Sequence, residues 1–195
     1  FRSISHFINV LLYAFSGMLI FNIFVKLFSY QSQWNPLNKK KWLLSIPFVA
    51  AVLWIAHPIH TEVVANIKER DDIMALLGGL LALFYVLRYL ETNKPQHLIY
   101  SSLAFFLGLL SKENTITFFA VIPLCMYFFT SKKAKEYFKV LAPLLGVTIV
   151  FLIIRYQVLG VAAQNNIPNK LMNDPFLYAT FGDKYATIFY TLGHS

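Results

Sequence analysis

Two histidines and a carboxylate stand close together in the stretch His57-Pro58-Ile59-His60-Thr61-Glu62. Pro58 disfavours helix at His57 and suits the first turn of a new helix, so the two imidazoles are expected on adjacent turns. Neutral imidazoles with a carboxylate such as that of Glu62 can bind a divalent metal, but two histidines and one acid form an incomplete ligand set. Hydrogen-bonded histidines at an interface, or a site that holds a sugar or phosphate, are the alternatives.

Ionisable side chains continue through the stretch Thr61–Asp72, which ends in Arg70, Asp71 and Asp72. Its apolar residues fall on one side of a helix, so the stretch is compatible with one short helix that lies on a membrane surface. On one interpretation this helix is only a solvated surface element. On the other it forms the wall of a cleft that contains Arg70 and Asp71.

A tight charged turn, Ser111-Lys112-Glu113-Asn114, joins two apolar segments. Charges so close to hydrocarbon are costly unless they pair or reach water. Lys112 therefore either snorkels with Glu113 as its partner or binds an anionic group such as a lipid phosphate. Arg155 ends another apolar run, and its guanidinium suits bidentate phosphate contacts. Lys112 and Arg155 on the same face would form a phosphate clamp.

Other polar residues inside apolar segments have simpler interpretations. His6 and Asn9 lie one turn apart in the first apolar segment, where a buried polar side chain usually bonds a neighbouring helix. Cys125, the single cysteine, lies inside an apolar run and provides neither a disulfide nor a thiolate metal site.

The composition indicates that lipid is the solvent. Of the 195 residues 57% are hydrophobic and only 13% are charged, whereas about a quarter is usual in a soluble domain. The net charge of +8 does not indicate a nucleic-acid partner, because the cations sit in short loops and not on one face among exposed aromatics. Membrane lipids are the expected surroundings.

Six apolar segments stand out: Ile4–Phe28, Trp42–Ala56, Ile73–Leu90, Leu98–Leu110, Ile116–Thr130 and Val140–Ile154. A straight crossing takes about 20 residues, so the shorter segments must sit inside a bundle that tolerates polar helix ends. Leu177–Leu192 is either an interfacial helix or the start of a further crossing. The sequence therefore predicts an all-α fold, a polytopic transmembrane helical bundle of about six or seven membrane segments.

The cations predict the orientation of these segments. If the first segment runs from outside to inside, the inner connections carry ten cations against two acids. The outer side carries seven of each, so the whole net charge falls inside. By the positive-inside rule the motifs described above are then extracytoplasmic. The inner cations are Lys26, Lys39, Lys40, Lys41, Arg88, Lys94, Lys132, Lys133, Lys135 and Lys139, against Glu91 and Glu136.

Taken together, the motifs resemble those of the transmembrane and tetratricopeptide-repeat O-mannosyltransferases and their bacterial relatives. His57–Ala65 followed by Arg70-Asp71 looks like the first hallmark of that family, and Leu110–Glu113 looks like the second. Three further segments are similar and occur in the family's order. His6–Leu12 precedes both hallmarks, with Tyr13 where a histidine is common. Arg155 with Val158–Gly160, and then Asn173–Pro175, come after them.

The resemblance implies a GT-C type glycosyltransferase, a multi-helix membrane enzyme whose active site faces away from the cytoplasm. Such enzymes move a sugar from a polyprenyl-phosphate donor to a protein, lipid or glycan acceptor. Lys112 and Arg155 would then hold the donor phosphate. The substrate cleft would be shaped by His57, His60, Glu62, Arg70, Asp71 and Glu113. No cofactor is named, and a divalent metal stays an open alternative.

Besides Tyr13, the chain departs from the family in a second respect. The family's catalytic acid lies in a first outer loop that precedes the helix opening this chain, so no catalytic residue is named. Residues 1–195 are accordingly expected to form part of a transmembrane glycosyltransferase domain, without the first helix, that loop and the C-terminal repeats, and to be inactive alone. A bacterial plasma membrane is preferred to the endoplasmic reticulum. A transporter or flippase fragment, or a non-catalytic scaffold, are the alternative functions.

Overall fold

Helix is the expected conformation for apolar segments in lipid, because a helix satisfies its backbone N–H and C=O groups within one segment. The computed structural model describes residues 2–30, 45–164, 180, 182–183, 185–187 and 190, and within them all regular secondary structure is helical. The chain divides into two compact units, Phe1–Ile153 and Ile154–Ser195, which are described separately.

Six helices in the described residues correspond, in order, to the six predicted apolar segments. They are α1 (Arg2–Ser29), α2 (Ile46–Ile55), α4 (Arg70–Thr92), α5 (Gln96–Ser111), α6 (Phe118–Phe129) and α7 (Ala134–Gln164). Short helical turns lie between them: α3 (His60–Ala65), η2 (Ile67–Glu69) and η3 (Glu113–Thr117). The prediction of an all-α membrane bundle is confirmed.

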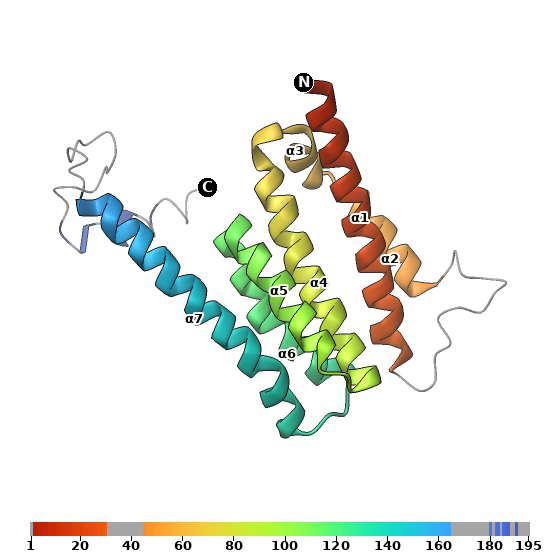
Figure 1. The fold of residues 1–195 in the computed structure, drawn as a ribbon. Coiled ribbons are helices and arrows are strands. Elements are labelled where there is room, and N and C mark those ends of the chain that lie inside the picture. Colours follow the sequence, from red (N-terminus) through yellow and green to blue (C-terminus); the bar gives the residue numbers. More distant parts are fainter. Residues whose placement is uncertain are drawn as a thin grey trace. The chain divides into compact units, whose positions relative to one another are not determined.

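Helix α4 is the centre of the first unit. It packs most extensively on α5 and also on α1, while α2 packs on α1, and Figure 1 shows α4 between α1 and α5. Twelve of its 23 residues are buried, on more than one side of the helix. A helix that is apolar nearly all round belongs in an interior position. Its neighbours complete the core with Leu19, Ile23, Phe105, Leu109, Ile122, Met126 and Leu144.

The outer faces of the helices remain apolar. Phe7, Leu11 and Met18 on α1 and Phe128 on α6 are each more than half exposed. A contiguous apolar surface of this kind is rare on soluble monomers and fits contact with lipid. Within the part of the chain that the structure describes, three helices are long and apolar enough to cross a membrane: Ile4–Ser29, Arg70–Thr92 and Ala134–Val158. The shorter helices pack around them, so the described chain is an integral membrane protein.

The structure corrects two details of the sequence interpretation. Thr61–Asp72 is not one surface helix: α3 ends at Ala65, and the side chain of the next residue, Asn66, accepts a hydrogen bond from the backbone N–H of Lys68 and so caps η2. Asparagine competes in this way with helical backbone bonds. Arg70 therefore begins the long helix α4. In addition, α7 begins at Ala134, six residues before the predicted apolar segment Val140–Ile154.

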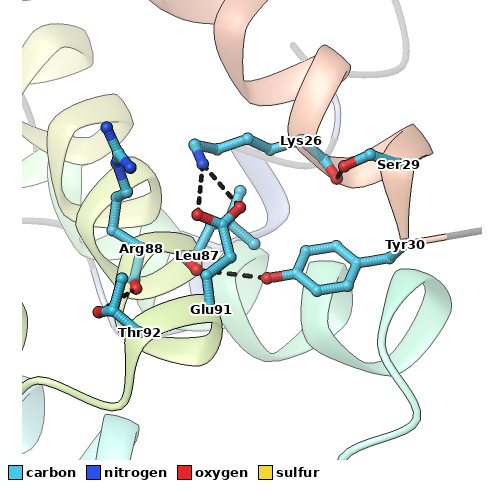
Figure 2. Close-up of polar contacts among 7 residues, drawn as sticks. All are labelled: Lys26, Ser29, Tyr30, Leu87, Arg88, Glu91 and Thr92. Atoms are coloured by element: carbon cyan, nitrogen blue, oxygen red, sulfur yellow. Dashed lines mark hydrogen bonds and ion pairs between the residues drawn. The ribbon is translucent and has the colours of Figure 1, made fainter. Parts of the chain in front are cut away.

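One end of the first unit, here called the lysine-rich end, joins the C-terminus of α1 to that of α4. Lys26 Nζ lies 2.6 Å from Glu91 Oε1, and the Tyr30 hydroxyl donates to the Leu87 carbonyl over 3.3 Å (Figure 2). Burial, and then the nearby Glu91 carboxylate, raises the pKa of Tyr30 to about 12. Lys132 also donates to the Leu90 carbonyl over 3.2 Å. Lys26, Glu91 and Lys132, which were predicted to lie on the same side of the membrane, thus lie at one end of the bundle, whereas Lys39, Lys40 and Lys41 lie outside the described residues.

Candidate functional site at the histidine end

The opposite end of the first unit, here called the histidine end, contains most of the residues that the sequence marks as chemically capable. The start of α1, α3, the start of α4 and η3 meet there, since Asn9 and Ser5 contact Arg70 and Lys112 contacts Asp72. Asp71 and Asp72 lie in the first turn of α4, where the helix dipole favours negative charge.

A pocket of about 350 Å³ opens between α1 and the segment that joins α2 to α3. It is lined by His6, Val10, Tyr13, Ile55, Ala56, His57, His60, Thr61, Val64 and Ala65. Its walls therefore combine apolar side chains with imidazole and hydroxyl groups. Binding sites for small molecules typically have such a mixture, with a few polar groups that fix orientation.

Aromatic rings are stacked at this pocket. The rings of Trp54 and His60 have centroids 4.4 Å apart, and Tyr13 lies 5.4 Å from Trp54 in a stacked arrangement. The Tyr13 hydroxyl donates to the Ile55 carbonyl over 2.8 Å, near the C-terminus of α2. This bond fixes the tyrosine ring beside the histidines, and the rings form a rigid wall.

The two histidines lie near each other, but the helix does not restart at Pro58 as predicted, because α3 begins only at His60 and His57 stays in the connection. The turn Pro58-Ile59 separates α2 from α3, and the imidazole centroids of His57 and His60 lie 6.0 Å apart. Burial, and then the neighbouring His57, lowers the pKa of His60. His60 is therefore uncharged at neutral pH, and one of its ring nitrogens can accept a hydrogen bond.

Arg70 is tied to α1. Its Nε donates to Asn9 Oδ1 over 2.9 Å, and its Nη2 donates to the Ser5 carbonyl over 3.2 Å. Asn9 is fully buried, and its Nδ2 donates to the Asn66 carbonyl over 3.2 Å. The expected packing role of Asn9 is confirmed, and the asparagine links α1 to both η2 and α4.

Lys112 pairs with an acid on α4. Its Nζ lies 2.6 Å from Asp72 Oδ2, and both side chains are about one third exposed, at 35% and 30%. The hydrogen bond that Lys112 donates to Asp72 raises the pKa of Lys112, and the charges of Asp72, Asp71 and Glu69 add to this effect. Beside the pair, a small pocket of about 170 Å³ is lined by Asp72, Asn114, Thr115 and Thr117 among others. Ala75, Leu76 and Phe118 complete the lining, so the pocket is mixed in character and Lys112 pairs with one of its lining residues.

The structure does not bring all predicted site residues together. Glu62, Asp71 and Glu113 are exposed, and none of them lines either pocket. Arg155 lies in the second unit, whereas Lys112 lies in the first, so the clamp stays a prediction. Asn173–Pro175 lies outside the described residues. Among the residues the structure describes, no three histidine, cysteine or acidic side chains gather as a metal site.

Three residues near the site were not singled out from the sequence. Trp54 lies one helical turn before His57, and this spacing could have been recognised in the sequence. Tyr13 was noted only as a departure from the family pattern. Asp72, which holds Lys112, lies 40 positions away from it, and only the packing of α4 against α5 and η3 brings them together.

Comparisons with known proteins show which family the chain is similar to. Residues 6–158 match the family model described as dolichyl-phosphate-mannose-protein mannosyltransferase. Human protein O-mannosyl-transferase TMTC4 is 31% identical over 119 residues, 57% of this chain and 16% of that protein. Mouse protein O-mannosyl-transferase TMTC1 is 39% identical over 89 residues, 39% of this chain and 9% of that protein. No solved structure matches the chain.

The matched parts make up only a small share of each relative's length. The family match begins at His6, includes both histidines and Lys112, and ends beyond Arg155. The motifs, the helical membrane fold and the family match lead to one assignment. The chain belongs to the dolichyl-phosphate-mannose-protein mannosyltransferase family.

Proposed function

We propose that this chain is the membrane core of a GT-C type glycosyltransferase that moves a sugar from a polyprenyl-phosphate donor to a protein, lipid or glycan acceptor at the extracytoplasmic face. The family description and the relatives' names point to mannose on a dolichyl-phosphate carrier as the donor. One observation carries the proposal. The aromatic pocket of His57 and His60 and the Lys112 site lie at the same end of a membrane bundle.

The aromatic pocket suits a sugar. A pyranose ring has a face of C–H groups that packs on aromatic rings and a rim of hydroxyls that need hydrogen-bond partners. The ring of Tyr13, which stacks on that of Trp54, provides the first surface, while His57, His60 and Thr61 provide the partners. Glu62, Arg70, Asp71 and Glu113 complete the cleft in this proposal.

Lys112 suits the donor phosphate, with Arg155 as the second cation. The charges of three acids act on Lys112, and one of them, Asp72, forms an ion pair with its ammonium group. The donor phosphate must therefore replace Asp72 as the partner of Lys112. A positive charge beside the leaving phosphate stabilises the charge that develops during transfer. The Lys112–Asp72 pair is then the resting state of the phosphate site.

Binding of polyprenyl-phosphate mannose to the purified protein tests the proposal. Charge-assisted bonds contribute about 1.5–3 kcal/mol, so Lys112→Ala is expected to weaken binding roughly ten-fold or more, and Arg155→Ala to act in the same direction. Asp72→Asn removes the competing carboxylate and is expected to strengthen binding. Lys68→Ala, at an exposed cation of the same end, is the matched control. Unchanged binding in Lys112→Ala would show that the lysine has only a structural role, as one member of the ion pair with Asp72.

The remaining parts of the proposal follow from the resemblance. Residues 1–195 form part of a transmembrane glycosyltransferase domain, its catalytic acid comes from a preceding loop, and the isolated chain transfers no sugar. A sugar-transfer assay on that chain tests this point. For the membrane, the sequence preference was the bacterial plasma membrane over the endoplasmic reticulum. The relatives come from human and mouse and give that preference no support.

A further inference from the structure

A second pocket, larger and apolar, lies away from the histidine end. It has a volume of about 740 Å³, within the roughly 300–1,000 Å³ of ligand pockets. It is formed by one face of α5 and one face of the first half of α7. Its lining residues are Pro95, Leu98, Ile99, Ser102, Leu103, Phe106, Pro143, Gly146, Val147 and Val150. We call it the α5–α7 groove.

The groove is open at Gly146. A Cβ added there would meet no other atom within 4 Å, whereas a Cβ on Gly78 or Gly108 would clash with the neighbouring helix. Ser102 also lines the groove, and its hydroxyl makes no hydrogen bond within the described part of the chain. The α5–α7 groove thus offers an apolar slot with one unused polar group on its wall.

The groove begins at the lysine-rich end. Pro95 directly precedes α5 and follows Lys94, and Lys139 stands one turn before Pro143 on the same face of α7. Residues 131–139 contain four lysines and one glutamate. Lys133 and Lys135 are exposed, while Lys139 contacts Glu136 at 2.8 Å and remains 44% exposed. Both α5 and α7 also start at this end, so the positive ends of their dipoles add to the charge.

An apolar slot with a cationic mouth is complementary to an anionic phospholipid. We propose that the α5–α7 groove binds one such lipid, with an acyl chain along Leu98, Leu103 and Val147 and with its phosphate at Lys133 and Lys139. Each lysine near such a headgroup contributes favourably to lipid binding. This site is distinct from the proposed donor site, because Lys112 lies at the other end of α5. It does not depend on the chain being a transferase.

Native mass spectrometry of the purified protein tests the proposal with palmitoyl-oleoyl phosphatidylglycerol and palmitoyl-oleoyl phosphatidylcholine as probes. The wild type is expected to retain one phosphatidylglycerol in preference to phosphatidylcholine. Gly146→Leu fills the groove and is expected to lose that lipid. Ala142→Leu adds the same side chain at an exposed position outside the groove and is the matched control. Lys133→Gln and Lys139→Gln should each weaken retention about five-fold.

A second measurement keeps the proposal testable if Gly146→Leu does not fold. In Leu103→Trp, fluorescence is expected to be quenched by brominated phosphatidylglycerol and much less by brominated phosphatidylcholine. Equal retention or quenching by the two lipids would overturn the proposal, as would wild-type retention in a folded Gly146→Leu. Retention of polyprenyl phosphate in place of phosphatidylglycerol would identify the groove as part of the donor site, and this too would contradict the proposal.

Discussion

At the scale of single residues, Asn9 has the largest structural role at the histidine end. Its amide accepts from Arg70 and donates to the Asn66 carbonyl, and it is fully buried. Buried donors and acceptors cost free energy when they lose their partners. The Arg70 side chain points into the α1–α4 junction because Asn9 accepts its hydrogen bond there.

We predict that Asn9→Leu destabilises the protein by about 2–3 kcal/mol, because it leaves the Nε of Arg70 without its acceptor and the Asn66 carbonyl without its donor. The measurement is thermal unfolding of the purified protein in detergent. Asn22→Leu, on the same helix, is the matched control, since Asn22 is exposed and bonds only the Met18 carbonyl of its own helix. Similar losses in the two variants would mean that the Asn9 network contributes no more than a surface amide.

His60 gives a pH dependence of known sign. Burial and His57 lower its pKa below the usual 6.5, so the folded state binds a proton less readily than the unfolded state does. Stability is then greatest above that ordinary value and falls as the pH drops through it. We expect the unfolding midpoint to fall between about pH 7.5 and about pH 5.5, and to fall less in His60→Gln. An identical pH profile in the variant would assign the dependence to other groups.

At the scale of elements, the contact of α4 with α5 depends on small residues. Gly78 and Gly108 face each other so closely that a Cβ on Gly78 would lie 2.5 Å from the Gly108 Cα and 2.9 Å from the Ala104 carbonyl oxygen. Nearby, the Ser101 hydroxyl donates to the Ala82 carbonyl over 2.9 Å. In lipid, helices associate through such close packing and interhelical hydrogen bonds and not through a hydrophobic driving force.

We predict opposite effects for the same substitution at two glycines. Gly78→Ala forces α4 and α5 apart and should cost about 1–3 kcal/mol, because backbone atoms block the new methyl group. Gly146→Ala meets open space and should stabilise α7 by up to about 1 kcal/mol through helix propensity. Thermal unfolding in detergent compares the two. A neutral Gly78→Ala would show that the α4–α5 contact is looser than the described geometry.

Helices were easier to predict than their contacts. A single apolar segment in lipid satisfies its backbone hydrogen bonds as a helix, and for that reason all six helices were predicted in order. The break at Asn66 was missed, because helix-compatible residues on both sides conceal a local side-chain cap. The Lys112–Asp72 pair was also missed, because Glu113 is adjacent in sequence while Asp72 becomes adjacent only after α4 and η3 pack. Pairing across elements is not encoded by spacing along the chain.

At the scale of the molecule, the ion pairs of the first unit lie at the two ends of the bundle. Lys112–Asp72 is at the histidine end, and Lys26–Glu91 and Lys139–Glu136 are at the lysine-rich end. Transporters place substrate and ion sites near the bilayer midplane. Pockets with polar groups at one membrane surface fit an enzyme that works at that surface better than they fit a transporter.

The orientation of the bundle is the prediction that connects both ends. Cations are retained on the cytoplasmic side, so the lysine-rich end should face the cytoplasm and the histidine end the opposite compartment. In a Cys125→Ala background, the exposed positions Lys68→Cys and Lys135→Cys report the two ends. A membrane-impermeant maleimide added on the extracytoplasmic side should label Lys68→Cys at once, and Lys135→Cys only after the membrane is permeabilised. The reverse pattern would place the His57 pocket and Lys112 in the cytoplasm, where the proposed extracytoplasmic transfer could not take place.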